Sequence, residues 1–130
     1  MKINQFAFAF LAGLAASAVL APAFADADVA AGETEFKKCA VCHSGAEKKN
    51  KVGPWLAGIV GRPVASVEGY AYSQGMKDFA AKTPAWTEEV LNTYLKDPKG
   101  TVPGTKMTFA GEKDDAMRAN LIGYLKTLAP

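Results

Sequence analysis

The sequence has very few of the side chains that usually bind metal ions. Its 130 residues include one histidine, His43, and two cysteines, Cys39 and Cys42. A structural zinc site takes four cysteine or histidine ligands, so a protein-only zinc site here would need an acidic fourth ligand. Sustained alternation of apolar and polar residues is also lacking, which argues against a sheet built from half-buried strands.

An excess of charge of one sign is lacking as well. Fifteen basic and 13 acidic side chains give a net charge of +2, and removal of the first 25 residues would take away only Lys2 and leave +1. Such a balance argues against bulk nucleic-acid binding. The charge is unevenly distributed, because residues 37–51 hold five lysines against one glutamate and residues 96–113 hold four lysines against two acids.

The N-terminal residues have the order of a secretory signal rather than of a folded element. Lys2 supplies a positive charge, residues 6–20 are mostly apolar, and residues 23–25 (Ala-Phe-Ala) are small at the positions that a signal peptidase reads. The apolar run is short of the ~20 residues that a membrane-spanning helix needs. We predict a cleaved signal peptide over residues 1–25 and one small domain over residues 26–130. An uncleaved membrane anchor is the alternative.

Helix signals predict an all-α protein with three main helices. Residues 29–42 follow a potential N-cap at Asp28, and residues 87–96 begin at a potential N-cap, Thr87, and end before Pro98. Residues 113–128 have the clearest helical spacing, with one apolar face that consists of Met117, Leu121, Tyr124, Leu125 and Leu128. Residues 44–85 are rich in glycine and proline and predict loops, with one short helix near residues 74–81, and residues 97–111 are also predicted to be irregular. So long a loop region is unusual in a small domain unless the loops surround a cofactor.

The strongest motif is C-x-x-C-H, formed by Cys39-Ala-Val-Cys42-His43. This is the attachment signature of c-type haem, because two sulfurs one helical turn apart can each add to a haem vinyl group and the next imidazole can reach the iron. A disulfide would close a tiny loop and add little stability. A thioredoxin-type redox pair would need a βαβ pattern, which is not visible. We predict one covalent haem c, with Cys39 and Cys42 as thioether residues and His43 as an iron ligand.

The second axial ligand cannot be another histidine, which leaves the methionines of residues 26–130. Met117 falls on the apolar face of the last predicted helix, where a place in the core is favoured. Met76 lies near the predicted short helix and could fill a gap in the core. Met107 lies in an irregular segment fixed by Pro103, and loops held by rigid neighbours often carry ligands. We favour Met107, with Met76 as a minor alternative.

Taken together, these residues resemble the class I cytochromes c, most closely the short bacterial cytochrome c2 type, along nearly the whole of residues 26–130. Proline-glycine-threonine-lysine-methionine downstream of C-x-x-C-H is the most specific part of the resemblance. The matching pieces occur in the family's order: Gly32 and Phe36, Cys39-x-x-Cys42-His43, Gly53-Pro54-x-Leu56-x-Gly58, Gly61-Arg62, Gly69-Tyr-x-Tyr72-Ser73, Trp86, Tyr94-Leu95-x-Asp97-Pro98, Pro103-Gly-Thr-Lys-Met107, Phe109-Ala-Gly111 and Leu121-Ile-x-Tyr124-Leu125.

The resemblance implies roles for individual residues. Met107 matches the family's axial methionine, and Pro54 matches the proline whose carbonyl accepts a hydrogen bond from the ligand histidine. Gly32 matches the point where the first and last helices cross. Met76 stands where many relatives have an asparagine, so the hydrogen-bond network at that place stays unassigned. Five further residues match positions near the haem propionates or the methionine sulfur: Arg62, Tyr72, Trp86, Tyr94 and Thr105.

The resemblance also implies a small cytochrome c fold wrapped around the haem, and a monomeric, soluble, periplasmic carrier of single electrons that is not an enzyme. The implied partners are membrane redox complexes: a cytochrome bc complex upstream and a photosynthetic reaction centre or terminal oxidase downstream, in photosynthesis or respiration. Lysines near both ligand segments favour salt-sensitive docking to acidic surfaces, although each alone is equally well explained as a solvated side chain: Lys37, Lys38, Lys48, Lys49, Lys51, Lys99 and Lys106.

Two other functions stay open on the sequence. A five-coordinate c-type haem protein would act as a gas sensor or peroxidase, but ligation by His43 and Met107 would close both axial positions of the iron. An exported thiol protein without haem would give no haem in a pyridine haemochrome assay.

Overall fold

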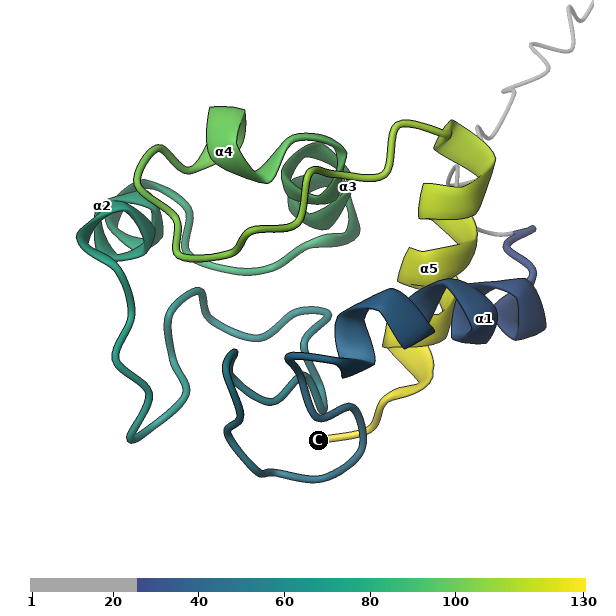
Figure 1. The fold of residues 1–130 in the computed structure, drawn as a ribbon, viewed down its shortest axis with the longest axis horizontal. Coiled ribbons are helices and arrows are strands. Elements are labelled where there is room, and N and C mark those ends of the chain that lie inside the picture. Colours follow the sequence, from purple (N-terminus) through teal and green to yellow (C-terminus); the bar gives the residue numbers. More distant parts are fainter. Residues whose placement is uncertain (1–25) are drawn as a thin grey trace, which may run out of the picture.

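The computed structural model describes residues 26–130, in which regular structure is entirely helical (Figure 1). The helices are α1 (Val29–Ala40), α2 (Gln74–Lys82), α3 (Glu88–Lys96), α4 (Pro98–Thr101) and α5 (Asp115–Thr127). Within the described residues, β pairing is limited to one isolated bridge between Pro63 and Ala85. The predicted all-α class with three main helices is therefore confirmed. The predicted signal peptide, residues 1–25, lies outside the described residues.

α1 begins at the predicted residue, Val29, and ends at Ala40, two residues before the predicted end. The Asp28 side chain accepts a hydrogen bond from the Ala31 N–H, so the predicted N-cap is confirmed. The helix ends at Ala40, but the N–H groups of Cys42 and His43 both bond to the carbonyl oxygen of Cys39, at 3.0 and 2.9 Å. The chain therefore makes one further tight turn, which holds Cys42 and His43 against the last residues of the helix.

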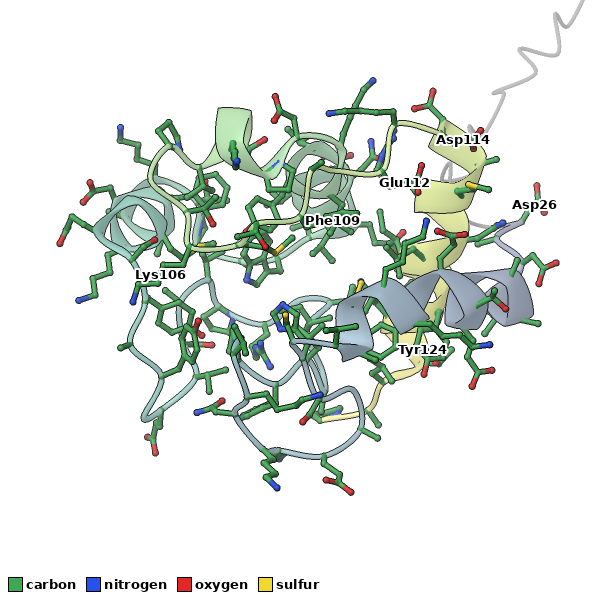
Figure 2. The ribbon with its side chains drawn as sticks, in the orientation of Figure 1. Asp26, Lys106, Phe109, Glu112, Asp114 and Tyr124 are labelled. Carbon is green, nitrogen blue, oxygen red and sulfur yellow. The ribbon has the colours of Figure 1, made fainter. Side chains whose placement is uncertain are left out.

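α1 and α5 cross at a glycine. A Cβ atom on Gly32 would lie 2.0 Å from the carbonyl oxygen of Asn120, which is possible only because glycine has none. The rings of Phe36 and Tyr124 pack beside this point with centroids 5.1 Å apart, and Tyr124 is labelled at the crossing in Figure 2. The Asp28 N–H adds a 2.8 Å hydrogen bond to the Asn120 side chain. Backbone contact and aromatic packing together fix the two helices on each other.

The predicted apolar face of the last helix is correct except for Met117. Leu121, Leu125 and Leu128 are buried, but Met117 is 46% exposed. Met117 lies in the first turn of α5, three residues after the N-cap Asp114, whose side chain accepts from the Met117 N–H. The prediction that Met117 lies in the core is wrong, because helical spacing does not show where along a helix the packing partner begins.

The segment after α3 is more regular than predicted. Pro98 is the first residue of α4, and the Asp97 side chain accepts from the Gly100 N–H, so a short helix follows α3 at once. Beyond it, residues 102–114 run back to α5, with Lys106 and Asp114 labelled near the two ends in Figure 2. Gly111 adopts φ +103° and passes so close to α3 that a Cβ would lie 2.3 Å from the Lys96 carbonyl oxygen. These contacts fix the path of the segment that carries Met107.

Residues 44–85 are loops apart from α2, as predicted, and the loops are tied by backbone hydrogen bonds to the rest of the molecule. The Gly58 N–H bonds to the Leu128 carbonyl oxygen at 2.6 Å. The Gly61 N–H bonds to Trp86, and the Trp86 N–H bonds back to Arg62, at 2.7 and 2.9 Å. The loop region is therefore ordered by contacts with residues far along the chain rather than by local structure.

Candidate functional site

The two cysteines lie at the C-terminal end of α1 as free, partly buried thiols. Cys39 is in the helix and Cys42 is in the turn that follows it. Burial raises the pKa of Cys39 to about 11, so this thiol is protonated at neutral pH. A redox-active C-x-x-C pair depends on a thiol with a lowered pKa. The environment of Cys39 therefore argues against the thioredoxin-type alternative.

The His43 ring is fixed on two sides. Its Nδ1 lies 2.7 Å from the Pro54 carbonyl oxygen, which places the proton on Nδ1 and leaves the Nε2 lone pair for a ligand bond. Gly53 makes room for the ring, since a Cβ there would lie 2.3 Å from His43 Cε1. Burial, the largest effect, lowers the pKa of His43, which favours the neutral imidazole. The neutral form is the one that binds metals.

Met107 lies partly buried in a short chain of polar contacts. The Tyr94 hydroxyl lies 3.6 Å from the Met107 sulfur and 3.3 Å from the Thr105 hydroxyl oxygen. The Met107 N–H donates to the same Thr105 oxygen at 3.3 Å. If the Tyr94 hydroxyl donates to the Met107 sulfur and the Thr105 hydroxyl donates to Tyr94, then both hydroxyl groups and the sulfur have a hydrogen-bond partner. Tyr94 and Thr105 therefore hold the thioether in one position.

The other two methionines occupy different places. Met76 is 9% exposed and belongs to the same core as Met107, and its N–H donates to the Ser73 hydroxyl in the first turn of α2. Met117 is on the exposed part of α5 described above. The geometry therefore leaves Met76 as the one alternative thioether near Met107 in the described residues.

Three of the five residues that the resemblance places near the haem propionates or the methionine sulfur are close together in the structure: Arg62, Tyr72 and Trp86. Arg62 donates from Nη1 to Ala57 O and from Nη2 to Trp55 O, each at 3.0 Å, while its buried Nε–H has no partner among the described residues. Burial lowers the pKa of Arg62, and the nearby Tyr72 phenol opposes this. Trp86 is buried with its ring centroid 5.0 Å from that of Tyr94. A partly buried guanidinium with one buried, free N–H suits an anionic group.

Two residues of this region were not singled out from the sequence. Gly53 entered the sequence analysis only as part of the matching piece Gly53-Pro54-x-Leu56-x-Gly58, and its role beside the imidazole depends on the fold. Trp55 was not considered at all, yet the Arg62 guanidinium carbon lies 4.6 Å from the Trp55 ring centroid. No local spacing rule predicts a stacking contact across a loop, so neither role could be read from the sequence.

Comparison with known proteins agrees with this arrangement. A family model described as cytochrome c matches residues 29–129. The chain belongs to the cytochrome c family. It is 52% identical over 111 residues to cytochrome c2 of Blastochloris viridis, covering 85% of this chain and 84% of that protein. It is 48% identical over 99 residues to cytochrome c-550 of Ancylobacter novellus, covering 75% and 92%.

A solved structure supports the same assignment of fold. Ferricytochrome c2 from Rhodopseudomonas palustris matches with a TM-score of 0.71 and 35% sequence identity, covering 78% of this chain and 98% of that one. The resemblance to the cytochrome c2 type of class I cytochromes c is thus confirmed. So are the predicted function of an electron carrier rather than an enzyme, and the predicted cofactor, one covalently attached haem c.

The donor set in this structure fits such a cofactor. Two thiols, an imidazole with Nε2 free and a thioether sulfur come from the C-terminal end of α1 and from the segment before α5. A carboxylate would complete the hydrogen bonds of Arg62. Within the described residues no set of three or more histidine, cysteine, aspartate or glutamate side chains could hold a metal ion alone. None of the helices in residues 26–130 is long and apolar enough to cross a membrane.

Proposed function

We propose that the chain is a periplasmic carrier of single electrons in which Cys39 and Cys42 bind the haem through thioethers. In this proposal His43 and Met107 are the axial ligands of the iron. The observation that carries it is the fixed imidazole: Nδ1 is held by Pro54 O at 2.7 Å, so that Nε2 is the ligand nitrogen, one residue after the second thiol. When bound, the haem supplies the redox centre that gains and loses one electron.

The proposed role of the chain is to fix both ligands. Tyr94 and Thr105 orient the Met107 sulfur, and Gly53 and Pro54 orient the His43 ring. Arg62, Tyr72 and Trp86 surround the propionates in this proposal. Thioether ligation of the iron raises the reduction potential relative to two imidazoles. Closed axial positions also suit an electron carrier better than a gas sensor or peroxidase.

A methionine series tests the ligand assignment. Met107→Ala is expected to retain covalent haem in the pyridine haemochrome assay, to lose the red-end charge-transfer band of the oxidised protein and to have a lower reduction potential. Met117→Ala is the matched control, because Met117 is exposed, and it is expected to keep the parent spectrum. A parent spectrum in Met107→Ala would transfer the ligand role to Met76. Colourless protein from a host that attaches haem would contradict the whole proposal.

The proposal includes export and removal of residues 1–25. Ala27 lies directly over Gly123 of α5, and the Asp28 N–H bonds to Asn120, so contacts with the body of the domain begin two residues after Ala25. Cleavage after Ala25 would therefore leave all of these contacts intact. Mass spectrometry of the periplasmic protein is expected to give Asp26 as the first residue. A mass that includes residues 1–25 would support the uncleaved anchor instead.

Docking through lysines is the proposed route to partner complexes, namely a cytochrome bc complex as donor and a reaction centre or terminal oxidase as acceptor. Lys51 is well placed, because its ammonium donates to the Ala40 carbonyl oxygen at 2.6 Å, beside the cysteine turn. Lys38 is less available, since it bonds to Glu35 at 2.6 Å and lies 3.4 Å from Glu112. The lysines therefore differ in how much charge they offer to a partner.

Ionic strength and two lysine variants test this docking. Bimolecular rates with a partner reductase should fall as salt rises, because surface charges are screened beyond about 10 Å at 0.1 M salt. Lys51→Gln is expected to lower the rate at low salt, while Lys126→Gln, whose ammonium is already paired with Glu88, serves as the control. Rates that do not depend on salt would exclude lysine docking.

A further inference from the structure

The sequence has two arginines, Arg62 and Arg118, and their guanidinium groups are satisfied to different degrees. Arg118 is 3% exposed, and its guanidinium donates to the Asn92 side chain, the Glu112 carbonyl oxygen and the Asp115 carboxylate. Arg62 donates to two carbonyl oxygens only, its Nε–H is buried without a partner, and it takes no part in the ion pairs found in residues 26–130. Arg62 is only partly buried, but its Nε–H is cut off from water and has no compensating hydrogen bond, which is unfavourable.

Trp55 contacts the Arg62 guanidinium with its ring and with its backbone. The guanidinium carbon of Arg62 lies 4.6 Å from the Trp55 ring centroid, within the range of a cation–π contact. The carbonyl oxygen of Trp55 accepts from Arg62 Nη2, and that of Ala57 accepts from Nη1. One short turn, residues 55–57, thus supplies both hydrogen-bond acceptors and the aromatic face. Arginine stacks on such faces better than lysine because its guanidinium is planar and weakly hydrated.

The turn that carries Trp55 is itself fixed beside the imidazole. Trp55 follows Pro54, whose carbonyl oxygen holds His43 Nδ1, and the Leu56 N–H donates to the Ser44 carbonyl oxygen at 2.8 Å. The backbone on both sides of Trp55 is therefore held in place. Because the backbone of this turn is held by other residues, we infer that the turn positions Arg62 and that Arg62 does not position the turn.

We propose that Trp55 is a positioning residue that keeps the Arg62 guanidinium in its partly buried place, with the free Nε–H available to a haem propionate, and thereby raises the reduction potential. This inference rests on the proposed haem site. A positive charge held in a region of low dielectric constant favours the reduced haem, which carries one positive charge fewer than the oxidised form. Without the ring, the guanidinium would turn toward water and its field at the haem would weaken.

The first test measures how well the Arg62 Nε–H is protected from solvent. Solvent exchange of the Arg62 Nε–H is measured by nuclear magnetic resonance in the reduced holoprotein. Trp55→Leu keeps an apolar side chain but removes the aromatic face, and exchange should become about tenfold faster, the scale of losing a partly desolvated cation–π contact. Trp55→Phe keeps a ring and should restore slow exchange. Equal exchange in the parent and Trp55→Leu would overturn the proposal.

The second test separates positioning from simple exclusion of water. Trp55→Leu and Arg62→Gln should each lower the reduction potential, and the double variant should lie no lower than Arg62→Gln alone. If Trp55 acted only by keeping water out, its loss would lower the potential by the same amount with or without Arg62, and such additivity would overturn the proposal. Haem content and the red-end band are recorded for every variant. Loss of either would indicate failure of the haem site itself, which is a different result from failure of this inference.

Discussion

The crossing of α1 and α5 gives the sharpest test of how the fold is held together. A Cβ added at Gly32 would lie 2.0 Å from Asn120 O, 2.6 Å from Asn120 C and 2.9 Å from Tyr124 Cβ. Two of these three atoms are backbone, so the clash cannot be relieved by a change of side-chain rotamer. Gly32→Ala would force the helices apart by roughly 1 Å or more, in a core that tolerates little change of volume.

The cost of Gly32→Ala follows from two opposing effects. Overpacking usually lowers the free energy of unfolding by about 1–3 kcal/mol, and contact with backbone places this case near 3 kcal/mol. Replacing glycine by alanine within a helix returns about 1 kcal/mol. We expect a net loss of about 2 kcal/mol, which corresponds to a fall in Tm of about 10 °C for a domain of this size.

Gly123→Ala is the matched control in the same helix pair. A Cβ there would meet the Ala27 Cβ at 2.6 Å, but Ala27 precedes α1 and can shift without moving either helix. We expect a change between no effect and a gain of about 1 kcal/mol. Guanidinium unfolding of both holoproteins, followed by far-ultraviolet circular dichroism, measures the difference. Equal stability of the two variants, with unchanged m-values, would refute the argument that backbone contact at Gly32 fixes the crossing.

Three further changes probe the site and its supports. Gly53→Ala would place a Cβ 2.3 Å from the His43 ring, and we expect less low-spin haem in the visible spectrum; an unchanged spectrum would show that the ring can move freely. Gly111→Ala combines φ +103° with a clash at the Lys96 carbonyl, and urea unfolding should show a loss of about 2–3 kcal/mol. Burial raises the pKa of Tyr94, so the stability from its neutral phenol is full below about pH 10 and is lost as pH rises through the folded-state pKa; Tyr94→Phe should lose less stability than the parent as pH rises above about 10 in denaturation at each pH.

The sequence was informative about the fold where the signals are local. Asp28 and Thr87 cap α1 and α3 as predicted, because a cap depends only on residues three positions away. Pro98 was interpreted as the stop of a helix, but proline also suits the first turn of a new one, and Asp97 supplies the cap. Met117 fits the helical spacing of the core residues yet is exposed, since spacing carries no information about the extent of the partner surface.

In the candidate site, too, residues in a local motif could be predicted from the sequence, whereas contacts between distant residues could not. The two thiols and the imidazole lie within five consecutive residues, 39–43, so the haem-attachment residues and the first proposed iron ligand could be recognised as a motif. Met107 required an argument from loop rigidity, and the structure adds its contact with Tyr94, thirteen residues away. Trp55 and Arg62 are seven residues apart and meet only because the loop between them turns back on itself. Such contacts are set by tertiary structure, which no local pattern describes.

The arrangement of supports also explains why a small, loop-rich domain suits electron transfer. The segment that carries Met107 is held at three places by three different parts of the chain. Gly75 of α2 packs directly on the Pro103 carbonyl, the Lys106 ammonium donates to the Ala71 carbonyl oxygen at 2.8 Å, and Glu112 N–H donates to the Leu95 carbonyl oxygen of α3 at 2.8 Å. A sulfur on a segment fixed at both ends moves little when the charge at the proposed iron site changes. Preorganised ligands of this kind reduce the rearrangement that accompanies a change of charge, so the loops contribute rigidity through their anchors rather than through regular structure.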